Sequence, residues 1–250
     1  MAFRKNNTYK YESGKTFRLS RSGIDSFINC KRCFYLNKVG NIKDIGMPGF
    51  SLNSAHDELM KKELDIYREK AEAHPYMDSL ERNLIPFKHE NMEDWRNNRK
   101  GITYHHEKTD LVITGSVDDV WIDTDTNELI IVEYKSTSTT KEIDLYDGTP
   151  WKEQYRRQID IYQWLFKMNG FKVADDSVFL YSNGLKTSKR FNDVMKFKTY
   201  VLEYKGSTEW VEPKILEIKK VLDQGTIPGL NEECDTCSYV ESVESLVKKN

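Results

Sequence analysis

Four charged side chains stand out because they lie within two apolar segments. They are Asp118, Asp119, Glu133 and Lys135, in segments 111–122 and 129–135. Both segments are rich in β-branched residues, which favours strands, and the polar residues between them predict a turn. Charges in a covered strand cost free energy unless they are paired or bound to a metal. Glu133 and Lys135 share one strand face by alternation, so the hairpin predicts a catalytic or metal-binding site.

Four cysteines form a second set that could do chemistry. Cys30 and Cys33 make one C-x-x-C pair, and Cys234 and Cys237 make another. In a reducing compartment such pairs are more often metal ligands than disulfides. Four thiolates suit either Zn²⁺ or a [4Fe–4S] cluster. We predict a metal centre that joins the N-terminal helix to the C-terminal tail, with four unrelated free thiols as the alternative.

Composition sets the outer bounds. A chain of 250 residues forms one domain with insertions or two small domains. The net charge of −2 gives no global field toward nucleic acid or a membrane. Residues 1–21 carry six basic residues against one acid, and Lys186, Lys189 and Arg190 form a second basic cluster. Each is either a solvated basic segment or a rim that attracts phosphates.

The chain lacks an apolar run of membrane-spanning length and a signal-peptide core, so we expect a soluble, cytoplasmic protein. The elements that must position the charged residues follow from periodicity and turn residues. We expect a helix from Ser20 or Ser22 through Leu36, with Cys30 and Cys33 on one face. The other expected elements are helices at 51–71, 151–170 and 207–225 (the last with a serine cap), and strands at 102–107, 111–122, 129–135, 177–183 and 196–204. This order predicts a mixed α/β core.

Three motifs occur in a telling order: Gly115-Ser-Val-Asp118, Glu133-Tyr134-Lys135 and Gln158-x-x-x-Tyr162. Together they resemble the PD-(D/E)XK nuclease superfamily, specifically its RecB-like exonuclease branch. That branch has an upstream helical histidine, matched here by His56, and includes iron–sulfur members whose N-terminal helix the segment 17–36 resembles. The resemblance spans roughly residues 17–240.

The resemblance implies a restriction-endonuclease-like mixed sheet flanked by helices, with an N-terminal helical arm and a cysteine-bound metal clasp. We expect a single nuclease domain over residues 20–240, with a basic N-terminal tail at 1–19 and a C-terminal tail at 241–250. Residues 74–100 are polar, with scattered aromatics and two prolines. We interpret them as an insertion that is helical or irregular.

The resemblance also assigns roles. Asp118, Glu133 and the Tyr134 carbonyl would hold Mg²⁺ or Mn²⁺, which carboxylate oxygens suit. His56 would be a further ligand, and its imidazole favours Mn²⁺. Lys135 would orient the attacking water and help it lose its proton.

Several assignments have alternatives. Asp119 competes with Asp118 as the ligand, although the family spacing favours Asp118. His56 could be a buried core histidine. Gln158 and Tyr162 share a helix face at i,i+4 and either surround Lys135 and a substrate phosphate or simply pack.

The aromatic residues and the cysteines also leave choices open. We expect Trp151, Tyr155 and Trp164 in the core, with Tyr155 beside Arg156 and Arg157 as a possible strand-binding groove. The cysteines depart from the family pattern, because iron–sulfur members usually have one N-terminal cysteine and three near the C-terminus. The resemblance still favours [4Fe–4S] over Zn²⁺ here.

The predicted function is metal-dependent DNA hydrolysis, most simply exonucleolytic on single-stranded or frayed DNA, in repair, recombination or phage DNA processing. The sequence contains no helicase motif, so a helicase or recombination motor would be a separate partner. The alternatives are a catalytically silent nucleic-acid-binding module with the same fold, and an endonuclease or an enzyme that acts on RNA.

Overall fold

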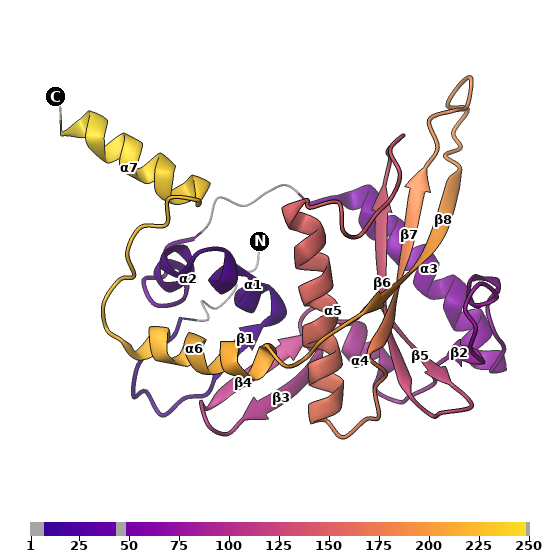
Figure 1. Cartoon of the computed structure of the whole chain (residues 1–250), viewed down its shortest axis with the longest axis horizontal. Coiled ribbons are helices and arrows are strands. Elements are labelled where there is room, and N and C mark those ends of the chain that lie inside the picture. The colour runs from indigo at the N-terminus through magenta and orange to yellow at the C-terminus, as the bar shows by residue number, and fades with distance from the viewer. Residues whose placement is uncertain (1–7, 44–48, 249–250) are drawn as a thin grey trace. The chain divides into compact units, whose positions relative to one another are not determined.

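The computed structural model describes residues 8–43 and 49–248. These residues divide into two compact units. The first unit comprises residues 8–43, 104–114 and 209–248, and the second comprises 49–103 and 115–208. Each unit is therefore built from segments that are distant in sequence. Figure 1 labels the elements of both.

The first unit is built on a small sheet with strand order β1-β4-β3. Strand β1 runs parallel to β4, with Phe17 opposite Leu111. Buried apolar residues from the sheet and helices form its core, including Phe27 and Phe34, whose rings lie 5.2 Å apart. Its elements are β1 (Phe17–Ser20), α1 (Arg21–Asn29), α2 (Lys31–Lys38), β3 (Ile102–His106), β4 (Leu111–Gly115), α6 (Val211–Asp223) and α7 (Asp235–Val247).

The second unit is built on a five-stranded sheet with order β2-β5-β6-β7-β8. Strands β6 and β7 are parallel, and the other neighbouring pairs are antiparallel. Helix α5 makes the long crossover that a parallel pair requires. The elements are α3 (Ser51–Lys70), the 3₁₀ turn η1 (Pro75–Met77), β2 (Leu84–Pro86), α4 (Met92–Arg96), β5 (Asp119–Asp123), β6 (Leu129–Thr137), α5 (Pro150–Met168), β7 (Asp176–Gly184) and β8 (Phe197–Lys205).

Alternation along β6 gives the two faces of this sheet different coverings. Ile130, Val132 and Tyr134 belong to an apolar cluster that includes Met60 and Leu64 of α3. The intervening Glu133 points toward α5, where Gln158 contacts it. Figure 1 shows the sheet with α5 and α3 on its opposite sides. The predicted mixed α/β architecture is confirmed, and β6 is its central strand.

The structure corrects two expected strands. Segment 111–122 is not one strand, because β4 ends at Gly115 and β5 begins at Asp119, and the two belong to different sheets. Segment 102–107 contains β3, which pairs in the smaller sheet instead of the central one. The link 116–118 between β4 and β5 therefore carries Asp118 on irregular backbone.

The N-terminal helix is also interrupted. Cys30 has extended backbone (φ −159°), and it ends α1 and begins α2. Its Sγ accepts a hydrogen bond from the Cys33 amide at 3.4 Å. The sulfur thus caps the second helix as a side-chain oxygen does at other helix starts. This capping explains a break that apolar periodicity does not reveal.

Three further segments differ from expectation. Residues 74–100 contain η1, β2 and α4, so the expected insertion contributes an edge strand to the sheet. Helix α6 begins at Val211 with Trp210 at the N-cap, so the expected serine cap is absent. Helix α7 replaces most of the expected tail, and Cys237 is its one buried residue in the described part.

Helix α5 matches the expected helix at 151–170, with Gly170 just beyond it at φ +86°. None of the helices in residues 8–43 and 49–248 is long and apolar enough to cross a membrane.

Candidate active site

Asp118 lies in the link between β4 and β5, where it contacts the central strand. Its Oδ2 accepts a hydrogen bond from the Tyr134 amide at 2.9 Å. The Lys61 ammonium of α3 lies 3.4 Å from Oδ1. The side chain is 18% exposed, so the carboxylate is anchored to β6 and still reaches the surface.

Glu133 and Lys135 form the centre of the site on β6. The Lys135 ammonium lies 2.6 Å from Glu133 Oε1 and 3.3 Å from Gln158 Oε1. Gln158 Nε2 donates to the same Glu133 oxygen at 2.7 Å. Glu133 is buried, with 4% of its side chain exposed, whereas Lys135 is 15% exposed. Their shared strand face, expected from alternation, brings both side chains to helix α5.

Helix α5 supplies the wall of the site. Gln158 Nε2 also donates to the Tyr162 hydroxyl at 2.9 Å, as the i,i+4 spacing predicts. The Lys135 ammonium lies 4.3 Å from the centre of the Tyr155 ring, a cation–π contact. Gln158 thus contacts Lys135 directly, and Tyr162 contacts Gln158.

Gly115, the first residue of the 115–208 segment, lies close to this helix. A Cβ atom at position 115 would lie 2.5 Å from the Tyr162 ring. No side chain fits at that distance, so the glycine of the Gly115-Ser-Val-Asp118 motif has a steric role. It lets the chain pass close to α5 three residues before Asp118.

His56 lies near the start of α3, and its contacts are with Asp57 and Phe197 instead of with Asp118 or Glu133. Its Nδ1 lies 3.5 Å from Asp57 Oδ1 and its ring centre lies 5.3 Å from that of Phe197 on β8. The same nitrogen is buried and has no hydrogen-bond partner among the residues the structure describes. The structure thus joins Asp118, Glu133, Tyr134, Lys135, Gln158 and Tyr162 by direct contacts and leaves His56 beside β8.

Asp119 is not a surface residue but the centre of a buried charge cluster. Its side chain is fully buried, and its Oδ1 accepts from Arg68 of α3 and lies 3.1 Å from Arg96 of α4. Its Oδ2 accepts from the Tyr134 hydroxyl at 2.7 Å. Both arginine side chains are nearly buried, at 5% and 6% exposed. One carboxylate faces two guanidinium groups, and Asp65 adds a second carboxylate 2.9 Å from Arg96.

This cluster contacts two residues of the candidate site, Tyr134 and Asp118. Burial, and then the charge of Asp119, raise the pKa of Tyr134 well above its usual value, so its hydroxyl stays protonated and donates. Burial opposes the charge of Arg96, but Asp119 and Asp65 outweigh burial and raise the pKa of that guanidinium. Arg96 Nε donates to the backbone carbonyl of Asp118 at 3.1 Å. The cluster therefore fixes the backbone of Asp118 and the side chain of Tyr134.

Sequence reasoning did not find Lys61, Arg68 or Arg96. Lys61, Asp65 and Arg68 follow the i, i+4, i+7 spacing of one helix face. A charged stripe on a helix that must cover a sheet was the available signal. Arg96 lies on the five-residue helix α4, where periodicity carries little information.

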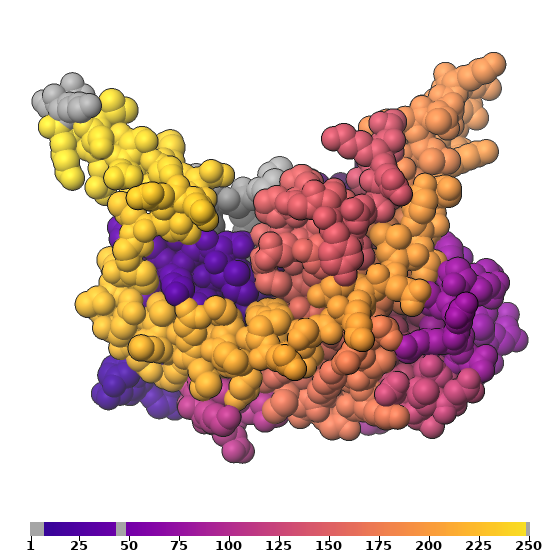
Figure 2. Space-filling view, viewed as in Figure 1, coloured from indigo at the N-terminus to yellow at the C-terminus, as the bar shows by residue number. Residues whose placement is uncertain are grey.

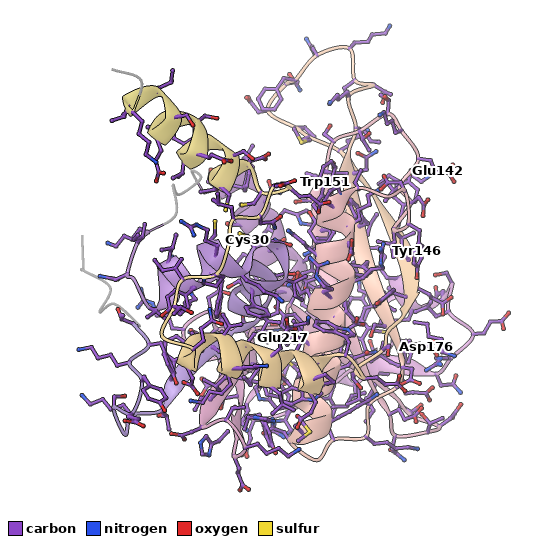
Figure 3. All side chains as sticks on the ribbon, turned by 60° about the vertical axis from the view of Figure 1, so that its left-hand side comes forward. Cys30, Glu142, Tyr146, Trp151, Asp176 and Glu217 are labelled. Atoms are coloured by element: carbon purple, nitrogen blue, oxygen red, sulfur yellow. The ribbon has the colours of Figure 1, made fainter. Side chains whose placement is uncertain are left out.

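The predicted burial of the aromatic residues is right for Trp164 and wrong for Trp151. Trp164 is buried as expected, but Trp151 is 53% exposed at the start of α5, so its core assignment was wrong. Tyr146, in the loop before this helix, is 62% exposed and lies under the Arg156 guanidinium at 4.7 Å. Figure 3 labels Tyr146 and Trp151 on this part of the second unit.

Comparison with known families decides the family of this chain. Residues 18–242 match the family model of the PD-(D/E)XK nuclease superfamily. The chain belongs to the PD-(D/E)XK nuclease superfamily. A search of curated proteins finds no match to the chain. Membership points to a metal-dependent nuclease, a hydrolase with a nucleic acid as substrate.

The donor chemistry of this PD-(D/E)XK site fits a hard divalent cation. The Asp118 and Glu133 carboxylates offer oxygen ligands, and outside their direct contacts the His56 imidazole has a buried nitrogen without a hydrogen bond. Lys61 and Lys135 lie against the two carboxylates. In the described part of the chain, only the cysteines bring three or more potential ligands within 4.8 Å of one another.

The four cysteines form a separate centre in the first unit. Cys30 Sγ lies 3.6 Å from Cys237 Sγ, and Cys33 Sγ lies 3.7 Å from Cys234 Sγ and 3.9 Å from Cys237 Sγ. Burial, the largest cause, raises the pKa of the Cys30 and Cys33 thiols. The predicted convergence of the two C-x-x-C pairs is confirmed, and the four sulfurs are close enough to bind one metal centre.

Proposed function

We propose that this protein is a deoxyribonuclease that hydrolyses phosphodiester bonds at the Asp118–Glu133–Lys135 site. One observation carries the proposal: Lys135 contacts Glu133 and Gln158 while Asp118 binds the backbone amide between Glu133 and Lys135. A structural ion pair would require only two of these groups. The convergence of two carboxylates, a lysine and an amide at one strand supports catalysis.

Asp118, Glu133 and the Tyr134 carbonyl would hold Mg²⁺ or Mn²⁺, with His56 as a further ligand. Such an ion supplies charge neutralisation at the phosphoryl oxygens and lowers the pKa of water. The buried His56 nitrogen without a hydrogen-bond partner supports its role as a ligand. An imidazole in the ligand set favours Mn²⁺ over Mg²⁺.

Lys135 would orient the attacking water and help it lose its proton. Its ammonium is held on one side by Glu133 and Gln158 and on another by the Tyr155 ring. These contacts restrict the long side chain to one position, which reduces the entropy lost on reaching the transition state. Gln158, itself hydrogen-bonded to Tyr162, would keep Glu133 and Lys135 in register.

The substrate we infer is DNA with a single-stranded or frayed end, and the cleavage is exonucleolytic. The motif order and the helical His56 support the RecB-like branch of the superfamily. The process would be repair, recombination or phage DNA processing, with a helicase or recombination protein as a separate partner. Tyr146 and Trp151 are exposed near the start of α5, where unstacked bases could contact them.

The cysteine centre would stabilise the first unit without touching substrate. The resemblance to iron–sulfur nucleases supports a [4Fe–4S] cluster. The sulfur–sulfur distances of 3.6, 3.7 and 3.9 Å support Zn²⁺, because four thiolates about 2.3 Å from one tetrahedral ion lie about 3.8 Å apart. In a cluster each thiolate binds a different iron, which requires wider spacing. Elemental analysis and visible absorption of protein purified without oxygen would separate the two.

The test of the main proposal is a nuclease assay with end-labelled single-stranded, double-stranded and forked DNA in Mg²⁺ or Mn²⁺. We expect release of short products from ends of the single-stranded and forked substrates. Asp118→Asn should abolish product and Asp78→Asn, at an exposed residue that follows η1, should not. Cleavage of circular single-stranded DNA would instead identify an endonuclease. Binding without any cleavage in either metal would identify the silent module and overturn the proposal.

A further inference from the structure

The turn that connects β7 to β8 has the composition of a nucleic-acid contact. Five cations lie between residues 184 and 198, against the single acid Asp193. Among the residues the structure describes, none of the five pairs with a carboxylate. They are Lys186, Lys189, Arg190, Lys196 and Lys198, and all are exposed.

The tip of this hairpin is a formed turn that presents apolar side chains. Asn192 and Asp193 both have positive φ, at 48° and 55°, and the Val194 amide donates to the Phe191 carbonyl at 3.1 Å. Asn and Asp suit such a two-residue turn because they tolerate the left-handed region. Phe191 is 68% exposed and Val194 is 57% exposed. Figure 2 shows the tip extending away from the rest of the second unit.

The hairpin is connected to the candidate active site through its base. Tyr181 of β7 is the register partner of Lys135, and Gly184 pairs with Phe197 at the end of the ladder. The Phe197 ring contacts the His56 ring. Three residue steps along extended strand separate Tyr181 from Gly184, which is roughly 10 Å. The cationic turn therefore begins roughly 10 Å along the sheet from Lys135, the length of about one or two nucleotides.

The loop that precedes α5 braces the same base. Ser138 Oγ donates to the Gly184 carbonyl at 2.7 Å, and the Lys186 ammonium donates to the Ser138 carbonyl at 3.1 Å. Asn183 exchanges hydrogen bonds with the backbone of Thr139 at 2.9 and 3.0 Å. These bonds fix the base of the hairpin relative to β6, while its tip stays accessible.

We propose that residues 185–196 bind the single strand of the substrate beside the active site. The lysines and Arg190 would hold successive phosphates, and Phe191 would stack on a base. Cations with an exposed aromatic ring are what single-strand recognition requires, because charge follows the backbone and stacking tolerates any base. This inference rests on the proposed nuclease function and adds its substrate-binding element. An acidic protein partner is the competing occupant.

The experiment measures binding of a fluorescent single-stranded oligonucleotide by anisotropy, in Mg²⁺, with Lys135→Ala in every protein so that the strand stays intact. Phe191→Ala should weaken binding roughly tenfold to a hundredfold, the usual range for one lost base stack. Lys189→Ala with Arg190→Ala should lower the slope of log affinity against log salt by about 1.4, because each lost phosphate contact contributes about 0.7 on single strands. Phe191 and both cations are exposed, so far-UV circular dichroism should be unchanged.

Control variants on α3 and in the link between α5 and β7 test whether the loss of binding is specific to the hairpin. Leu59→Ala removes an apolar side chain that is 65% exposed, and Lys70→Ala with Lys172→Ala removes two exposed cations. Both controls should bind as the parent does. If the parent binds DNA and both hairpin variants keep its affinity and salt slope, the inference is wrong. If the otherwise unmodified chain neither binds nor cleaves DNA, the proposed function fails as well.

Discussion

The two candidate metal centres of this chain differ in the charges that surround their ligands. The Asp118 and Glu133 carboxylates each have a lysine beside them, at 3.4 and 2.6 Å. The four cysteine sulfurs contact one another at 3.6 to 3.9 Å. Carboxylates on a braced sheet keep their positions through protein contacts alone. Thiolates gathered from both ends of the sequence repel one another and depend on a cation.

This contrast predicts a structural role for metal at the cysteines and a chemical role for metal at the carboxylates. The second unit holds the carboxylates of the proposed site with Tyr134, Gln158 and the Arg96–Asp119 cluster. The first unit joins α2 to α7 mainly through the sulfurs, since Cys237 is the one buried residue of α7 within the described range. Removing metal should therefore unfold one region and merely silence the other.

The largest effect is expected from Cys234→Ser. Structural zinc sites contribute on the order of 10 kcal/mol of apparent binding free energy, and losing one of four ligands forfeits much of it. Hydrogen exchange followed by mass spectrometry should show faster exchange in α2 and α7 with little change in β6. Ser242→Ala on the exposed face of α7 is the control. Full metal content and unchanged hydrogen exchange in the variant would contradict a structural role for the cysteine centre.

Next in size is Asp119→Asn, which leaves Arg68 and Arg96 buried without their shared carboxylate. Breaking a buried ion pair in this way commonly costs about 3–5 kcal/mol. Urea unfolding should report this loss, with tryptophan fluorescence as the probe because Trp95, Trp121, Trp151 and Trp164 all lie in the second unit. Asp118→Asn is the matched control, expected to lose activity with little loss of stability. Equal stability of both variants would mean that the cluster does not support the site.

Lys135→Ala should remove the group that orients water. Comparable losses in other hydrolases lower the rate on the order of 10²-fold or more. Turnover on a labelled single strand measures this, and the free energy of unfolding should stay near that of the parent. Lys141→Ala, an exposed neighbour in the following loop, should retain activity. Near-parental turnover in Lys135→Ala would remove the residue from the proposed mechanism.

His56→Ala should give the smallest effect of the four. Loss of one outer ligand should shift the Mn²⁺ activation curve by roughly tenfold, with folding unchanged because His56 packs mainly against Phe197. Titrating activity against Mn²⁺ gives the shift, and Phe197→Leu controls for loss of the ring contact. Superimposable curves for His56→Ala and the parent would identify a packing histidine.

The sequence was informative where a pattern is local. Alternation placed Glu133 and Lys135 on one face of β6, and i,i+4 spacing placed Gln158 and Tyr162 together on α5. The equal spacing of the two cysteine pairs predicted their convergence. Each inference used neighbours within one element, or a residue type with few alternative roles.

The sequence was misleading where the outcome depends on distant partners. Nothing in LVITGSVDDVWI marks a break, because the reason for it is the ring of Tyr162 against Gly115. The sequence alone leaves Asp119 as an alternative ligand to Asp118, but Arg68 and Arg96, 51 and 23 positions earlier, bury it. Helix α7 escaped notice because it is largely exposed and its apolar residues follow no core-facing stripe.

The interleaving of the two units along the chain sets an order of assembly during synthesis. The second unit is complete once residue 208 has been made, whereas the first also requires residues 209–248. Cys30 and Cys33 therefore leave the ribosome about 200 residues before Cys234 and Cys237, with the whole nuclease sheet translated in the interval. At the usual 5–20 residues per second this is a delay of roughly 10–40 s. The early thiols are exposed to oxidation and to competing metals during that time, and the centre that they form closes last.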